Sequence, residues 1–275
     1  MLRLLGFEGL YMKVSVVVPT FYRSDALSEF FDSLLKQTVK PIETVIVDDT
    51  PTDAIRNLCG KYSVKFKEVS IALVYIKNPK ERSASIARNV GVKNARGDVV
   101  MFFDSDVILY SDYIERILEV FKAHPNALGV QGWIVNLGKG KFYYLFQTLN
   151  KLFLLQHHSE DSCKYSEYPI VLTKIINCEW LSGANMALKP KVFNEFRFDE
   201  NLKKYSFMED FLLSHSIFKK YPNGLFMTPQ AKCVHKVSKK GRMNSINRKE
   251  HIRRCRKYVF TKLFGSKGLL VYHWQ

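Results

Sequence analysis

Several features that define other classes of protein are missing from this chain. No apolar run approaches the roughly 20 residues needed to cross a bilayer, because Arg3 and Glu8 interrupt the short N-terminal run. The cysteines are few and odd in number, at positions 59, 163, 178, 233 and 255. Their spacing argues against a disulfide framework or a zinc site and for a reducing compartment. We therefore expect a cytoplasmic protein, soluble or peripheral on the cytoplasmic membrane face.

Internal repeats and low-complexity tracts are also absent, which favours a single compact unit. A chain of 275 residues with 47% hydrophobic content can bury one sizeable core. We expect one main domain over residues 13–235. Residues 1–12 are interpreted as a leader or an alternative start, and residues 236–275 as a C-terminal extension.

Acidic residues are scarce beside basic ones. The chain has 26 Asp or Glu against 42 Lys or Arg, a formal net charge of +16. Residues 236–267 alone carry 12 Lys or Arg and one acid, Glu250. Within them an apolar stripe recurs at helical spacing, formed by Ile252, Cys255, Val259 and Leu263. This pattern predicts a basic amphipathic helix that closes the core, presents its basic face to an anionic membrane surface, or does both.

Two aspartates follow a strongly apolar run at residues 99–103. Such a run, bounded by Gly97 and by polar residues, is typical of a buried central parallel strand. Ligands of open α/β sheets bind at the carboxyl edge of these strands. Side chains two residues apart on extended backbone point to the same side, so Asp104 and Asp106 can face one metal ion. The alternative for this triplet is a turn or a helix cap.

Two further strands are expected to end at the same edge. Residues 13–20 are mainly apolar and are expected to form a strand that ends at Pro19, because proline cannot donate a hydrogen bond to the sheet ladder. Residues 43–47 lead directly into Asp48 and Asp49. Carboxylates gathered at one edge repel one another unless a cation or hydrogen-bond donors hold them.

Helices are expected between these strands. Residues 24–35 have helical apolar periodicity, with Ser24 or Asp25 as the cap. A second helix is predicted over residues 83–93, which carry Arg88 and Asn89. For Arg82 and Arg88 the alternative to a ligand role is a solvated helix face. Strand, helix and strand in this order form right-handed crossover units, whose loops converge on one edge of the sheet.

Six short motifs stand in order along this part of the chain. They are Val16-Val17-Val18-Pro19-Thr20, Val47-Asp48-Asp49, Ala87-Arg88-Asn89-Val90-Gly91, Asp104-Ser105-Asp106, Leu181-Ser182-Gly183-Ala184-Asn185 and Glu209-Asp210. In this order and spacing they resemble the family 2 glycosyltransferases of GT-A fold, over roughly residues 13–235. The resemblance implies a Rossmann-like α/β fold with a mixed, mainly parallel sheet flanked by helices. It also implies an inverting enzyme that moves a sugar from a nucleotide-diphosphate sugar to an acceptor hydroxyl, with a divalent cation on the diphosphate.

The resemblance places the metal at Asp104, Asp106 and His235. Mn2+ or Mg2+ suits such an oxygen-rich site, and a hard cation stabilises the charge that develops on a leaving diphosphate. Asp106 is expected to coordinate the metal directly, while Asp104 reaches the ribose or a metal-bound water. For His235, which follows a short apolar strand, the alternative is a structural role.

The donor nucleotide is expected to contact the first strand ends. Asp49, and less so Asp48, can accept hydrogen bonds from a base, with a turn as the alternative for Asp48. The family often has tyrosine where this chain has Phe21, a change that keeps ring stacking and loses a phenol hydrogen bond. The predicted donor-binding residues are Pro19, Thr20, Phe21, Arg23, Asp48, Asp49, Arg82, Asn89, Asp104 and Ser105.

Asp210 is the expected general base, with Glu209 beside it in the acceptor pocket. The alternative is that both acids only complement the dipole of the helix they begin. The expected acceptor-binding residues are Trp180, Gly183, Ala184 and Asn185. The basic extension favours a membrane-proximal glycan or a lipid-linked acceptor. The apolar stretch 142–155 is expected to be a core helix, or else to frame that acceptor.

Three other classes remain as alternatives. A nucleic-acid binder would use the basic segment, but that segment lacks aromatic residues arranged for base stacking, and the acidic strand ends would repel phosphate. A nucleotidyltransferase of similar sheet would be expected to carry a glycine-rich phosphate loop after the first strand, and residues 19–23 contain no glycine. A catalytically silent relative serving as a partner subunit is the third, and the presence of Asp106 and Asp210 weighs against it.

Overall fold

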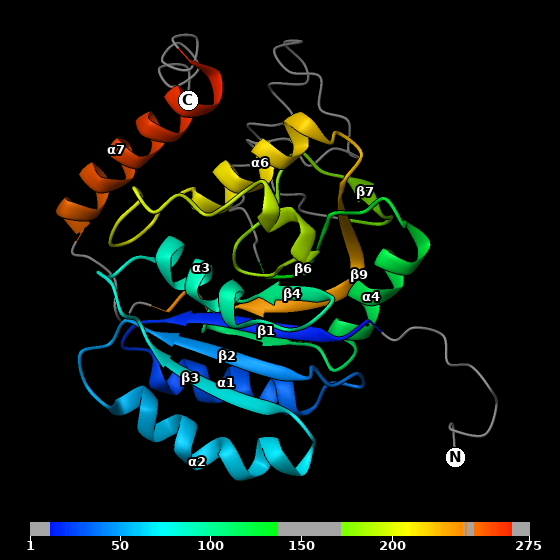
Figure 1. The fold of residues 1–275 in the computed structure, drawn as a ribbon, viewed down its shortest axis with the longest axis vertical. Helices are drawn as coiled ribbons and strands as arrows, with labels where there is room; N and C mark the ends of the chain where they lie inside the picture. Colours follow the sequence, from blue (N-terminus) through cyan, green and yellow to red (C-terminus); the bar gives the residue numbers. More distant parts are fainter. Residues whose placement is uncertain (1–11, 137–171, 239, 241–244, 266–275) are drawn as a thin grey trace.

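The computed structural model describes residues 12–136, 172–238, 240 and 245–265 (Figure 1). Residues 1–11 and the apolar stretch 142–155 lie outside them, so the expectations for those segments stay predictions.

In the described part of the chain, nine strands form one mixed sheet. Its first half is parallel, in the order β3 (Ala72–Lys77), β2 (Glu43–Asp48), β1 (Val14–Thr20) and β4 (Val99–Phe102). The second half continues from β4 with β8 (Met186–Leu188), β6 (Gly129–Ile134), β9 (Leu225–His235) and β5 (Val107–Leu109), and β7 (Ile176–Asn177) also pairs with β9. In this half β6 and β9 run parallel, and the other pairs are antiparallel.

Helices cover both faces of the sheet, as expected from the sequence (Figure 1). One face packs against α1 (Ser24–Leu35), α2 (Ala54–Glu68) and α4 (Tyr113–Ala123). The other packs against α3 (Ala84–Asn94), the 3-10 helix η1 (Pro190–Asn194) and α6 (Glu209–Lys220). The last described helix, α7 (Ser245–Phe264), lies on α6. None of the described helices combines the length and the apolar character that a membrane crossing requires.

Strand β1 shows how the sequence builds two cores. Val16 and Val18 pack into the core on the α1 face, whereas Val17 packs into the core on the α3 face. Successive side chains of a strand point to opposite faces, so a strand covered on both sides reads as a continuous apolar run. The expected buried parallel strands are therefore confirmed.

Two local expectations were wrong in detail. β1 continues through Pro19, which pairs with Val47, and ends at Thr20. The Val17 carbonyl accepts a hydrogen bond from the chain leaving β4, and residues two apart on a strand direct their backbone groups to the same side. The side of Pro19 that lacks an N–H therefore faces β4 at a point where the pairing with β4 has already ended, so no ladder hydrogen bond is lost. Helix α1 begins at Ser24 without a side-chain cap.

Helix α3 matches its expected bounds within one residue. Its capping residue is Ser83, whose hydroxyl accepts a hydrogen bond from the Ile86 N–H at 3.3 Å. Gly91 allows this helix to lie close on the sheet, because a Cβ there would come within 2.2 Å of a Val17 methyl group. The close packing places the middle of α3 directly over the carboxyl edge of the parallel strands.

Candidate active site

The turn between β4 and β5 carries the two aspartates of the Asp-Ser-Asp triplet. β5 pairs with the end of β9 so that Val107 lies opposite His235. This register brings His235 beside Asp106, the residue before Val107. Ser105, in the middle of the turn, is 2% exposed. The predicted cluster therefore forms through a strand pairing between residues more than a hundred positions apart.

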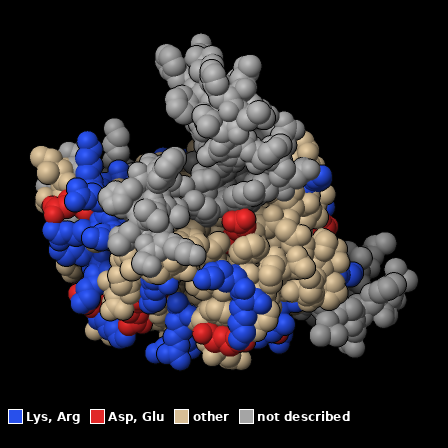
Figure 2. Space-filling view, turned by 90° about the horizontal axis from the view of Figure 1, so that it is seen from above, with Lys and Arg blue, Asp and Glu red and all other residues tan. Residues whose placement is uncertain are grey.

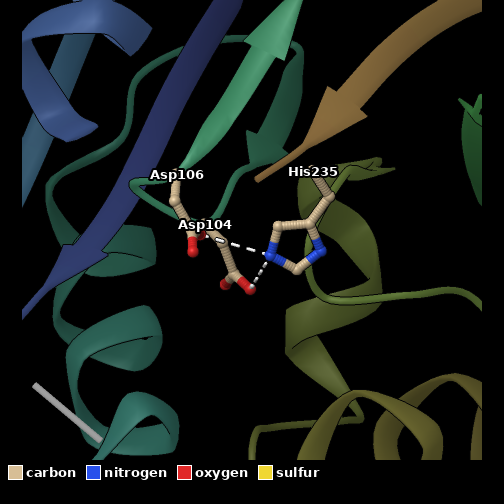
Figure 3. Close-up of side chains that lie close together, drawn as sticks. All are labelled: Asp104, Asp106 and His235. Carbon is tan, nitrogen blue, oxygen red and sulfur yellow. Dashed lines mark ion pairs between the residues drawn. The ribbon is translucent and has the colours of Figure 1, made fainter. Parts of the chain in front are cut away.

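The three side chains point toward one another (Figure 3). His235 Nε2 lies 3.2 Å from Asp106 Oδ1 and 3.7 Å from Asp104 Oδ2. One ligand atom from each residue lies within 4.8 Å of the others. Burial alone would lower the pKa of His235, but Asp106 and Asp104 raise it above its ordinary value.

Asp106 is the most enclosed member of this cluster. Its carboxylate is fully buried, and its Oδ2 accepts the Ser238 N–H at 2.7 Å. Its Oδ1 accepts no hydrogen bond of good geometry within the described residues and has only ion-pair contacts with His235 and Arg23, both at 3.2 Å. Burial would raise the pKa of Asp106, but these neighbours hold it below its ordinary value. Two carboxylates, one with an under-used oxygen, and an imidazole fit a hard divalent cation such as Mn2+ or Mg2+.

Arg88 is a site residue that the predicted site did not include. It is 2% exposed. Its guanidinium donates to Asp104 Oδ1 at 3.1 Å, to Glu209 Oε1 at 2.5 Å and to the Gly183 carbonyl at 3.3 Å. The small residues of α3 are the signal that could have found it: a helix that carries Ser85, Ala87 and Gly91 packs closely, so a charge within it needs buried partners.

Asp210 and Glu209 begin α6, as expected. Asp210 Oδ2 accepts the Gly183 N–H at 2.6 Å, and Oδ1 accepts the Phe211 N–H at 2.8 Å. Burial raises the pKa of Asp210. Burial also raises the pKa of Glu209 to about 8, although Arg88 pulls it down. A positioned carboxylate with a raised pKa is suited to accept a proton from a hydroxyl group.

The loop before β8 joins these acids to the aspartate cluster. Gly183 touches both Arg88 and Asp210, and a Cβ at Gly183 would lie 2.9 Å from Arg88 Nη2. The Ala184 carbonyl accepts the Asp104 N–H at 3.3 Å. Trp180 is half-buried, with its ring edge against Phe211 at a centroid distance of 6.2 Å.

On the donor side, Phe21 and Arg82 form a stacked pair. The Arg82 guanidinium carbon lies 3.5 Å from the centroid of the Phe21 ring. Asp49 nearby accepts a hydrogen bond from Asn78 Nδ2 at 2.5 Å, and burial raises its pKa to about 6. The Thr20 hydroxyl is buried without a hydrogen-bond partner in the described residues. Asn78 was not identified from the sequence.

Three predicted site residues are instead engaged inside the fold. Asp48 is fully buried and accepts the Thr50 N–H at 2.7 Å and the Tyr75 hydroxyl at 2.9 Å. Asn89 donates to the Phe198 carbonyl at 2.9 Å and to Glu200, and Asn185 donates to the Gly132 carbonyl at 2.9 Å. These hydrogen bonds hold loops in place, and for Asp48 the bond from the Thr50 N–H agrees with the turn that the sequence left as its alternative.

Arg23 lies against the aspartate cluster. Besides its contact with Asp106, its Nε donates to the Lys240 carbonyl at 3.1 Å. Pro19, the other predicted donor contact on β1, is half-buried at the strand end. Arg23 thus places a positive charge beside the same oxygen that a cation would use.

Comparisons with known proteins identify the family of this chain. Residues 15–183 match the family model described as Glycosyl transferase family 2. Glycosyltransferase GlyA of Streptococcus pneumoniae is 29% identical over 188 residues, which are 68% of this chain and 26% of that protein. Glucosyl-dolichyl phosphate glucuronosyltransferase of Haloferax volcanii is 32% identical over 126 residues, 45% of this chain and 39% of that protein. The chain spans well under half the length of either relative.

A solved structure shows the same fold. The mannosyltransferase PcManGT of Pyrobaculum calidifontis, in complex with GDP-Man and Mn2+, superimposes with a TM-score of 0.63 at 18% identity. The match covers 91% of this chain and 64% of that chain. The expected GT-A architecture is therefore confirmed.

Proposed function

Because the chain belongs to glycosyl transferase family 2, we propose that it moves a sugar from a nucleotide-diphosphate sugar to an acceptor hydroxyl with inversion at the sugar carbon. One observation carries the proposal. Arg88 contacts Asp104 of the candidate cation cluster and also the Gly183 carbonyl, while the Gly183 N–H holds Asp210. A donor-side cluster and an acceptor-side base are thus joined through one buried guanidinium.

The cation would be held by Asp104, Asp106 and His235. When bound, Mn2+ or Mg2+ would supply charge stabilisation to the leaving diphosphate. The buried, under-used Oδ1 of Asp106 and the closeness of the three ligand atoms support this assignment. The presence of Mn2+ with GDP-Man in the structurally similar mannosyltransferase supports the type of cation.

The donor nucleotide would bind along the ends of β1 and β2. Asp49 is the acceptor for a base N–H, and Asn78 orients its carboxylate. The Phe21 and Arg82 stack offers a flat cationic surface beside it. Pro19, Thr20 and Ser105 would line the same end of the sheet.

Asp210 would act as the general base. Each of its carboxylate oxygens accepts one backbone N–H, which fixes the group and leaves a lone pair for the acceptor hydroxyl. As the acceptor oxygen forms its bond to the sugar carbon, the proton passes to Asp210 and the nucleoside diphosphate leaves with the electron pair. A single displacement of this kind inverts the sugar carbon.

The acceptor would be a membrane-proximal glycan or a lipid-linked sugar, with Trp180, Gly183 and Ala184 on its side of the site. The name of the Haloferax relative, which specifies a glucosyl-dolichyl phosphate acceptor, supports a lipid-linked class. A peripheral position on the cytoplasmic membrane face is part of the proposal. The four cysteines in the described residues are buried and free, as a reducing compartment would keep them.

A thermal-shift panel tests the donor and the cation together. UDP-, GDP- and dTDP-sugars are added to the purified chain with and without Mn2+, because a ligand that binds only the folded state raises the melting temperature. We expect one nucleotide class to give a shift that depends on Mn2+. Asp106→Ala should remove the metal-dependent part, while Asp53→Ala, at an exposed aspartate just before α2, should not.

Sugar transfer is then measured for the donor that binds. Asp210→Asn should keep the metal-dependent shift and lose transfer, because the amide cannot accept the proton, although it also gives up one of the two backbone hydrogen bonds. If Asp106→Ala leaves both the shift and the transfer intact, the cation assignment is wrong. The absence of any shift with folded protein would favour the silent partner subunit.

A further inference from the structure

Helix α7 has an inner face that is already occupied. Three of the four residues of its predicted apolar stripe, Cys255, Val259 and Leu263, are buried in one cluster with Phe211 and Leu212 of α6, and the fourth, Ile252, is half-buried. The stripe is therefore unavailable for insertion into lipid. Any contact of α7 with another molecule must use its outer face.

The outer face is a row of basic residues. Lys249, Arg253 and Lys257 are exposed and follow Ile246 at helical positions i+3, i+7 and i+11. Ile246 is 79% exposed. Figure 2 shows Lys and Arg side chains gathered along the side of the molecule where α7 lies.

The three cations of this row have no ion-pair partner within the described residues. Other basic residues of α7 do: Arg254 pairs with Glu250, and Lys262 with Asp199 at 2.6 Å. The helix carries one acid, Glu250, which lies beside the row at three residues before Arg253, but its carboxylate pairs with Arg254. An unpaired row of cations with an exposed isoleucine at one end presents both kinds of contact that an anionic bilayer surface offers.

We propose that the outer face of α7, defined by Ile246, Lys249, Arg253 and Lys257, docks on an anionic bilayer surface. The three cations meet lipid phosphates, and Ile246 enters the boundary between headgroups and acyl chains. Each cation near such a surface strengthens binding by roughly fivefold.

The contacts of α7 join this surface to the acceptor side of the site. His251 Nε2 lies 2.7 Å from the Tyr205 carbonyl, and the Tyr258 hydroxyl donates to Asp199 at 2.8 Å. Tyr205 and Asp199 belong to the loop that leads into α6 and Asp210. Docking of α7 would therefore hold Asp210 at a set height above the bilayer, where a lipid-linked acceptor is presented. This orienting role rests on the proposed sugar transfer, whereas the lipid contact does not.

Co-sedimentation of the full chain with vesicles tests the contact. The vesicles contain phosphatidylcholine alone or with about 30 mol% phosphatidylglycerol, at low and at high salt. The test variant is Lys249→Glu/Arg253→Glu/Lys257→Glu. The matched control is Lys61→Glu/Lys65→Glu/Lys67→Glu on α2, three exposed lysines on a helix at the opposite end of the molecule (Figure 1).

We expect wild type to bind the anionic vesicles and not the neutral ones, with less binding at high salt. The α7 variant should lose at least roughly a hundredfold in partitioning, about fivefold for each of three cations, while the α2 control changes about twofold or less. Ile246→Ser should lower partitioning several-fold, and Val64→Ser, at a 63% exposed valine on α2, should not.

Equal losses in the α7 and α2 variants would overturn the proposal, because they would show a general charge effect. Lack of binding by wild type, or equal binding to neutral vesicles, would overturn it as well. Loss of affinity of the α7 variant for a soluble polyanion, with vesicle binding unchanged, would assign the face to a different partner. The Mn2+-dependent nucleotide shift of the α7 variant should match wild type, which shows that the variant is folded and separates a failure here from a failure of the proposed function.

Discussion

Replacement of Arg88 by methionine is the sharpest test of how the site is held together. Methionine preserves most of the volume and removes the guanidinium that joins Asp104, Glu209 and the Gly183 carbonyl. We expect the variant to fold with reduced stability, because two buried acceptors lose their donor.

The size of the loss follows from the burial of each partner. Glu209 is 6% exposed and the Gly183 carbonyl lies inside the site. Loss of the donor to either acceptor should therefore lower the free energy of unfolding by about 1–2 kcal/mol. The Asp104 side chain is 30% exposed and adds little, since water can replace the guanidinium there. The free energy of unfolding should therefore fall by about 2–4 kcal/mol at neutral pH.

The loss should also depend on pH in a defined direction. Arg88 holds down the pKa of Glu209, which burial raises to about 8, so Arg88→Met raises that pKa further. Above about pH 8 the wild-type carboxyl ionises in the folded state, whereas the carboxyl of the variant keeps its proton. The folded variant then binds more protons than folded wild type, so its relative stability falls by up to about 1.4 kcal/mol per pH unit.

Urea unfolding of wild type, Arg88→Met, Glu209→Gln and the double variant at about pH 7 and about pH 9 measures these terms. Glu209→Gln should recover part of the loss, because it removes the acid that Arg88 serves. A gap that is the same at both pH values, or a double variant as unstable as the sum of the two single variants, would refute the coupling described here.

Three further outcomes are expected. Arg23→Ala should tighten Mn2+ binding by roughly tenfold, measured by electron paramagnetic resonance of free Mn2+, because it removes a competing charge 3.2 Å from Asp106 Oδ1; weaker binding would show that Arg23 supports the cation instead. Asp49→Asn should be more stable than wild type by up to about 3 kcal/mol at about pH 7.5 and equally stable near about pH 4, because burial raises the pKa of Asp49 to about 6 and wild type loses stability as pH rises between these values. Urea unfolding at both pH values measures the difference in stability, and a difference that does not grow with pH would contradict the prediction. Gly183→Ala should lower kcat with little change in nucleotide binding, since its methyl group would lie 2.9 Å from Arg88 Nη2 and 3.1 Å from the Asp210 Cβ, whereas Gly60→Ala, which meets nothing within 4 Å, should leave transfer unchanged.

Local sequence patterns were sufficient for the parallel half of the sheet and for the positions of the acids. The continuous apolar runs of β1, β2 and β4 end in polar residues, and that pattern alone places Asp49 and Asp104 at one edge. The start of α6 at Glu209 was also predictable from the sequence, because apolar residues typical of a helix follow it.

Side-chain direction was not contained in those patterns. Asp48 and Asp49 are adjacent in sequence, yet Asp48 is fully buried and bonded to Thr50 and Tyr75, while Asp49, just past the end of β2, is half-buried and bonded to Asn78. Which of the two carboxylates can reach a ligand depends on how the neighbouring elements cover each one, and this is seen only in the folded chain. Arg88 and Asn89 pose the same problem on α3, where only the packed structure shows that one turns to the acids and the other to the Phe198 loop.

What the sequence by itself determined is a sheet edge lined with carboxylates, a family and a basic C-terminal segment, since each rests on short motifs that can be recognised locally along the chain. Tertiary structure alone decided the rest. The pairing of β5 with β9 brings His235 to Asp106, and the packing of α7 on α6 turns its apolar stripe inward and its cations outward. These contacts join residues far apart in sequence, and their formation depends on the free energy of the whole fold, which no local pattern records.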